Sequence, residues 1–213
     1  MTPTPSVPHL PAPGALLRLA MAFILLILCM QPAQAAPLQL ARDAQVIEAW
    51  PAVTVLHDPD NRLDAAAALA APERFERPRT AYASLGMLPG TTWLRIPVTV
   101  PKDATNGWVL QVDYALLDEL DVHLVRPEGL QKIASLGRMQ APSGESLAGR
   151  VPGALLRLTP GADYTVLLRV RSVGPKILPI TFMQPHAVLP EALGEQILQG
   201  LLLGLRITLF LYA

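Results

Sequence analysis

Cysteine is almost absent from this chain of 213 residues, which contains one. A single thiol excludes a disulfide framework and a cysteine-based metal site. An excess of either charge is lacking too, because 17 Lys and Arg residues balance 17 Asp and Glu residues. Binding to phosphate backbones needs a basic surface, so no nucleic-acid partner is expected.

Aromatic residues are scarce as well, at four Phe, three Trp and four Tyr, although 51% of the chain is hydrophobic. A charged fraction of 16% at this hydropathy argues against an intrinsically disordered chain. The apolar excess is therefore aliphatic. It requires either an aliphatic core or a part of the chain that lies in lipid.

The first apolar block has the order of a secretory signal peptide. Arg18 precedes a dense apolar run over residues 21–30, and the small residues of Ala33-Gln-Ala35 follow. We expect residues 1–35 to be a signal peptide, cleaved between Ala35 and Ala36. The apolar run is shorter than the ~20 residues of a spanning helix, which leaves a retained anchor as the alternative.

The second apolar block closes the chain over residues 196–213. Its Leu, Ile and Phe residues favour membrane insertion by about 5 kcal/mol, and Arg206 opposes it by about 3 kcal/mol. Gly200 and Gly204 have the G-x-x-x-G spacing of closely packed membrane helices. We expect residues 196–213 to begin a first transmembrane helix that is truncated here, with residues 189–195 as a juxtamembrane linker. The alternative is a buried amphipathic helix of a soluble domain.

The segment between these blocks, residues 36–188, has the patterning of one all-β domain. Residues 93–100 alternate with period two, which places Leu94, Ile96, Val98 and Val100 on one face and Trp93, Arg95, Pro97 and Thr99 on the other. Because proline cannot donate a ladder hydrogen bond, Pro97 indicates an edge strand or a bulge.

Further strands are expected over residues 108–114, 120–126, 154–158, 164–171 and 177–183, separated by Gly and Pro turns. One helix is expected over residues 64–71, capped by Asp64 and stopped by Pro72. Short strands at this spacing predict an antiparallel β-sandwich.

With these segments placed, the sequence resembles a known family, the second extracellular domain of bacterial seven-transmembrane receptors with diverse intracellular signalling modules (7TMR-DISM). The resemblance rests on the order of several stretches: residues 55–63, Phe75, residues 85–95, residues 108–128 and residues 164–172. The hydrophobic tail begins where the family places its first membrane span.

The resemblance implies a jelly-roll-like β-sandwich in the periplasm, tethered to the inner membrane, that binds small ligands such as carbohydrates. Family members continue through seven helices into kinase, cyclase or diguanylate cyclase modules. On this resemblance, the given sequence departs from the family by stopping inside the first helix, before any output module.

Catalytic signals are weak. Asp113, Asp118, Glu119 and Asp121 form the acidic cluster, and a glycosidase uses two carboxyl groups as acid and as nucleophile or base. A hydrolase that uses Asp113 with Asp118 or Asp121 is therefore the least favoured hypothesis. His57, His123 and His186 lack metal-ligand spacing. No catalytic residue, cofactor or metal is expected.

Binding residues are easier to nominate, because planar and charged side chains on strand faces suit sugar or carboxylate recognition. The alternative for each is a solvated residue or an ion-paired support. The nominated ligand-binding residues are Trp93, Arg95, Asp113, Tyr114, Asp118, Arg169 and Arg171.

The main hypothesis is a periplasmic sensor domain that couples the binding of a small solute to membrane helices. The second is an exported or tethered carbohydrate-binding module without a signalling role. Membrane partnership is expected through Gly200, Gly204 and Arg206, and a homodimer through the sensor domain or the membrane helices is a further expectation.

Overall fold

The computed structural model describes residues 36–80, 82–126 and 128–212, without the side chains of residues 189–199 and 211–212. The predicted signal peptide over residues 1–35, with its cleavage site after Ala35, lies outside the described residues. The strands and helices of the folded unit all come after this segment.

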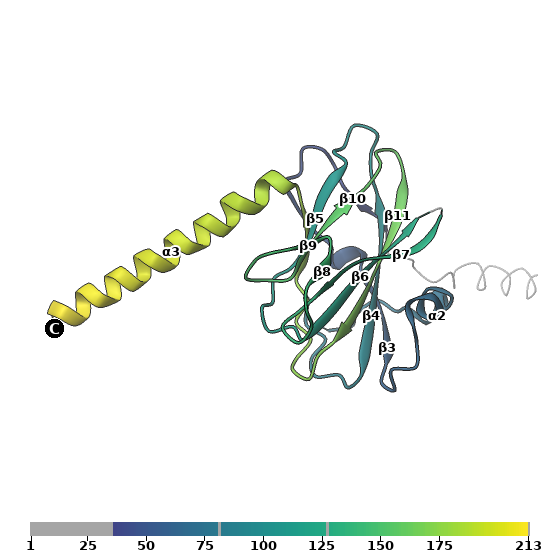
Figure 1. The fold of residues 1–213 in the computed structure, drawn as a ribbon, viewed down its shortest axis with the longest axis horizontal. Coiled ribbons are helices and arrows are strands. Elements are labelled where there is room, and N and C mark those ends of the chain that lie inside the picture. The colour runs from purple at the N-terminus through teal and green to yellow at the C-terminus, as the bar shows by residue number, and fades with distance from the viewer. Residues whose placement is uncertain (1–35, 81, 127, 213) are drawn as a thin grey trace, which may run out of the picture. The chain divides into compact units, whose positions relative to one another are not determined.

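Two β-sheets build the domain (Figure 1). The larger sheet has the strand order β1 (Leu38–Gln39), β4 (Thr91–Thr99), β11 (Asp163–Arg171), β6 (Glu119–Arg126), β7 (Gly129–Leu136) and β8 (Ser143–Gly144), and β3 (Thr54–Asp58) also pairs with β4. The smaller sheet has the order β2 (Val46–Glu48), β12 (Ile180–Met183), β5 (Gly107–Val112), β10 (Gly153–Arg157) and β9 (Ser146–Leu147). Every pair is antiparallel except β1 with β4.

The main core lies between the two sheets. Leu94, Ile96 and Val98 of β4 and Trp108 and Leu110 of β5 belong to one buried cluster, each at most 1% exposed. Period-two alternation puts these residues on the inner faces of their strands. The all-β sandwich and the inward faces expected from the sequence are confirmed.

The proline in β4 has a different setting from the one expected. β4 is an inner strand, with β11 along one side and both β3 and β1 along the other. The pairing with β3 ends at Arg95 and the pairing with β1 begins at Val98. Pro97 thus falls in the gap between two short partners, where a missing N–H group leaves no ladder bond unmade.

A short helix, α2 (Ala65–Leu69), covers part of the outer face of the larger sheet (Figure 1). The Asp64 side chain accepts a hydrogen bond from the Ala67 N–H at 2.7 Å, which is the expected N-cap. Two 3₁₀ turns, η1 (Trp50–Ala52) and η2 (Pro72–Arg74), complete the connections around β3.

The last strand leads almost directly into a long helix, α3 (Pro185–Tyr212). Only Gln184 separates α3 from β12, and α3 runs without a break through residues 189–195, where a linker was expected. Within the described residues, none of the helices has both the length and the apolar character that a membrane crossing requires. The membrane-span prediction for residues 196–213 stays a prediction, and Gly200, Gly204 and Arg206 are exposed on α3.

Candidate functional site

Trp93, the aromatic residue nominated for stacking, lies beneath α2. Its side chain packs with Leu56, Ala68 and Leu167 in a second, smaller core on the outer face of the larger sheet. Trp93 is 1% exposed, so its ring presents no surface to a ligand in this structure. Arg95 lies two residues further along the same strand face and is partly buried.

Arg169 and Arg171 belong to an ion-pair network on the same outer face. Arg169 donates to Asp121 at 3.0 Å and lies 3.8 Å from Glu119, and Arg171 lies 3.7 Å from Glu119. Lys132 and Ser135 on β7 also donate to Asp121, both at 2.9 Å.

These contacts stabilise the ionised form of Asp121, which is 5% exposed. Burial raises the pKa of Asp121, but hydrogen bonds from Lys132, Ser135 and Arg169 outweigh it and hold the pKa below its usual range. The carboxylate is therefore ionised at neutral pH and ties β6, β7 and β11 together.

Asp118 plays a similar part in the turn before β6. Its carboxylate accepts hydrogen bonds from the Val173 N–H at 2.7 Å, the Arg138 Nε at 2.7 Å and the Ser172 hydroxyl at 3.1 Å. The Val173 bond is the main reason that the pKa of Asp118 lies below its ordinary value. Asp118 thus joins the turn after β11 to the turn after β7.

The remaining nominated residues lie apart from this network. Asp113 pairs with Arg150 at 3.3 Å, and both side chains are more than half exposed. Tyr114 is partly buried and packs against the main core. The structure brings Arg169 and Arg171 together on one face with Arg95 and Trp93, but the ligand role of all seven residues stays a prediction.

The acidic residues are poorly suited to the acid step of a glycosidase. That step needs a carboxyl group whose pKa is raised, so that it carries a proton at neutral pH. Asp118 and Asp121 both have lowered pKa values and are occupied by donors. Among the described residues, no group of three or more His, Cys, Asp or Glu side chains is placed to hold a metal ion.

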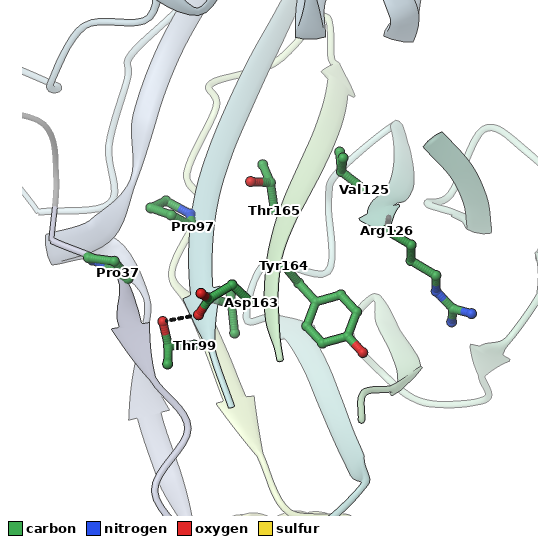
Figure 2. Close-up of a pocket in the computed structure, with 9 residues that line it drawn as sticks. Pro37, Pro97, Thr99, Val125, Arg126, Asp163, Tyr164 and Thr165 are labelled. Carbon is green, nitrogen blue, oxygen red and sulfur yellow. Dashed lines mark hydrogen bonds between the residues drawn. The ribbon is translucent and has the colours of Figure 1, made fainter. Parts of the chain in front are cut away.

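One groove is lined mainly by residues of the neighbouring strands β4, β11 and β6 of the larger sheet (Figure 2). It measures about 370 Å³, and Thr165 and Pro97 lie opposite each other on neighbouring strands in its wall. Figure 2 shows the Thr99 hydroxyl joined to the Asp163 carboxylate, a hydrogen bond of 2.7 Å. The polar groups of this groove are partly engaged with one another, and no aromatic face other than that of the largely buried Tyr164 lines it.

A larger groove of about 540 Å³ lies at the edge of β3. Arginine is its commonest lining residue, so we call it the arginine groove. It is lined by Val55, His57, Arg74, Glu76, Arg77, Pro78, Arg79, Thr80, Leu85 and Leu88.

None of the ligand-binding residues predicted from the sequence lines this groove. The available signal was the concentration of Arg74, Arg77 and Arg79 within six residues, in a chain whose total charge is balanced. Alternation could not assign these arginines to a site, because they lie outside the regular strands.

A buried lysine contacts the backbone of Leu88, a residue that lines the arginine groove. Lys176 is 0% exposed and its Nζ donates to the carbonyl oxygens of Leu88 and Gly90. Burial lowers the pKa of Lys176. The same stretch of chain is fixed by the Leu85 N–H, which donates to the Lys176 carbonyl at 2.9 Å.

The comparisons with known proteins agree with this architecture. The model of the 7TMR-DISM extracellular 2 family matches residues 51–184, from η1 to the residue before α3. No curated protein matches the chain. The family consists of extracellular sensor domains of membrane receptors and is not a known enzyme family. Since its model covers more than half of the sequence, this chain belongs to the 7TMR-DISM extracellular 2 family.

Proposed function

We propose that this domain binds a small solute in the periplasm and passes its occupancy through α3 to the helices of an inner-membrane receptor. The observation that carries the proposal is the family match, which ends at Gln184, one residue before α3 begins. Carbohydrates, the ligand class expected from the resemblance, belong in the first screen beside organic acids and amino acids.

The junction with α3 supports mechanical coupling. Gln184 is 5% exposed, and its backbone N–H donates to the Gln45 carbonyl at 3.0 Å. Its side-chain amide donates to the carbonyls of Arg42 and Ala44 at 2.7 and 3.2 Å. Three hydrogen bonds thus hold the start of α3 to the sandwich. Because only Gln184 lies between β12 and α3, a displacement of β12 would move the start of α3 with it.

The surface of α3 supports an apolar partner. Large apolar side chains are exposed over its last described turns, and Phe210 is 84% exposed. An aqueous environment disfavours so much exposed apolar surface. A membrane, or further helices of the same receptor, would cover it. The exposed apolar residues are Leu201, Leu202, Leu203, Leu205, Ile207, Leu209 and Phe210.

The test of coupling is an insertion of four Gly and Ser residues after Gln184 in the receptor that carries this domain. We expect signalling to become independent of solute while binding affinity stays unchanged, because a flexible linker transmits no displacement. The same insertion after Gly149, in an exposed loop, is the control and should leave both properties unchanged.

Signalling that survives the Gln184 insertion would contradict coupling through α3. Binding without any solute-dependent signal, before or after insertion, would favour a tethered binding module instead.

A further inference from the structure

A buried histidine lies on the outer face of the larger sheet, beside the second core. His123 of β6 is 8% exposed and is directly opposite Leu167 on β11. The centres of the His123 and Trp93 rings are 6.2 Å apart. Because α2 packs on Trp93 and Leu167, this helix covers the two side chains next to His123.

The charged groups nearest to His123 come from three neighbouring strands. Asp121 lies two residues earlier on β6, Lys132 of β7 is opposite His123, and Arg169 of β11 is opposite Asp121. Lys132 and Ser135 bond to one oxygen of Asp121, and Arg169 bonds to the other. Protonation of His123 would therefore add a third cation around one carboxylate that already has its donors.

The remaining charged groups on this face offer no better partner. Arg95 of β4 lies across Leu167 from His123 and is itself a cation. Glu119 of β6 pairs with the arginines of β11. The residues of α2 are all Ala or Leu, and its Asp64 cap is exposed. A protonated His123 would thus find the nearby carboxylates paired already.

The surroundings favour the neutral form of His123. Burial lowers its pKa, and the charges of Lys132 and Arg169 lower it further, against the opposite effects of Asp121 and of a backbone hydrogen bond with Leu167. The unfolded or opened state therefore binds the proton more readily. The stabilisation is complete above pH ~6.5, the ordinary value, and is lost as the pH falls toward the folded value.

The weakest part of the cover is α2. It has five residues and one N-cap bond, and a helix this short is not stable by itself. Its apolar residues pack in the second core and not in the main core between the sheets. Local opening of α2 would admit water to a protonated His123 and leave the sandwich folded.

We propose that His123 is a pH switch that controls α2: its protonation releases α2 from the larger sheet while the sandwich stays folded. Acidity is then a second input to the domain, beside the solute of the proposed function, and this inference does not depend on that solute. The transition uncovers Trp93 and Leu167, so the outer face presents an apolar surface only at acid pH.

The experiment is hydrogen exchange, measured by mass spectrometry on the purified full chain in neutral detergent. It runs from pH ~7.5 to pH ~5, on both sides of the ordinary histidine pKa, with labelling times scaled to the intrinsic rate at each pH. The reporters are the amides of Ala68 and Ala70, which donate to Asp64 and Ala66. Their protection should fall by up to about tenfold per pH unit below pH ~6.5, and β5 should keep its protection.

Three variants assign the effect. His123→Gln keeps a neutral polar side chain without the titrating ring, so the protection of α2 should stay constant over this pH range. Lys132→Gln removes a competing cation and leaves Asp121 free to accept from the protonated ring, so the loss should be smaller than in the wild type. His186→Gln is the matched control, because His186 is an exposed histidine on α3, and it should behave as the wild type.

Protection of α2 that does not change with pH in the wild type overturns the switch. So does a loss that persists in His123→Gln, or a loss that α2 and β5 show together, which is global unfolding. If His123→Gln does not fold, an undiminished loss in Lys132→Gln overturns the proposal instead. Each of these results leaves the solute proposal intact, because no solute takes part in the measurement.

Discussion

Charged residues on the outer face of the larger sheet act as structural ties between strands. Asp121 receives donors from three side chains on two neighbouring strands, and Asp118 joins two turns. Buried carboxylates of this kind contribute stability only when every oxygen has a donor. Both networks meet that condition, which accounts for acidic residues at two positions that are each 5% exposed.

Asp121→Asn should lower the free energy of unfolding at pH 7 by about 1–3 kcal/mol, because Lys132 and Arg169 lose a charged acceptor. Asp113→Asn is the control: Asp113 is ion-paired but 54% exposed, and its loss should cost less than about 1 kcal/mol. Urea unfolding measures both. Equal losses for the two variants would contradict a structural role that depends on burial.

The hydrogen bonds to Asp118 and Asp121 also predict that the free energy of unfolding falls at acid pH. The pKa values of Asp118 and Asp121 are lower in the folded state than in the unfolded state, so the unfolded state binds more protons as the pH falls. Their stabilisation is complete above pH ~4, the unfolded value, and is lost as the pH falls below it. Asp121→Asn should therefore lose less stability than the wild type between pH 5 and pH 2, as followed by circular dichroism.

Several of these residue roles could not be predicted from the sequence. Strict alternation placed Trp93 and Arg95 on the strand face opposite Leu94 and Ile96, and the structure has them there. Whether that face meets solvent, a ligand or another element depends on contacts between residues far apart in the chain. Leu167 and Leu56 approach Trp93 only after β3, β4 and β11 have paired.

At the scale of elements, α2 has a larger role than its length suggests. Its Ala68 is 0% exposed and closes a second core over β3, β4 and β11. An isolated helix of five residues is unstable in water, so α2 depends on this contact and on the Asp64 cap.

Trp93→Ala should destabilise the domain by about 3–5 kcal/mol, the usual cost of removing a large buried aromatic side chain. Trp93→Phe, which keeps most of the apolar contact, should cost clearly less. Guanidinium unfolding followed by circular dichroism measures both. A Trp93→Ala domain with unchanged stability and reduced solute affinity would instead make Trp93 a ligand residue.

Element prediction succeeded where the alternation was regular. The expected strands around Trp93, Trp108, Leu120 and Tyr164 all form, and the helix after Asp64 forms in a shorter version. β7 was missed because its alternation breaks: the pairing with β6 shifts between Val122 and His123. A bulge moves one residue out of register, so a period-two pattern no longer describes the strand.

In the whole domain, the short strands β1 and β2 pair with strands that come much later in the sequence. β1 pairs with β4 and β2 pairs with β12, so residues near position 40 support both sheets. Gln184 bonds to the same region just before α3. The class of fold was predictable from the regularly spaced strands and the turns between them. The pairing of β1 and β2 with later strands was not, because strands as short as β1 contain too few residues to show an alternating pattern.

A domain that senses a small solute must bind that solute in its folded state, and binding stabilises the folded state. The measurement is the unfolding temperature of the purified chain with sugars, organic acids and amino acids, each tested singly at increasing concentration. A ligand at 100 times its dissociation constant adds about 2.7 kcal/mol to the free energy of unfolding, which raises the unfolding temperature by several degrees. We expect a saturating rise in the unfolding temperature for one chemical class, and an unfolding temperature that stays unchanged with all three classes would show that the domain does not bind such a solute.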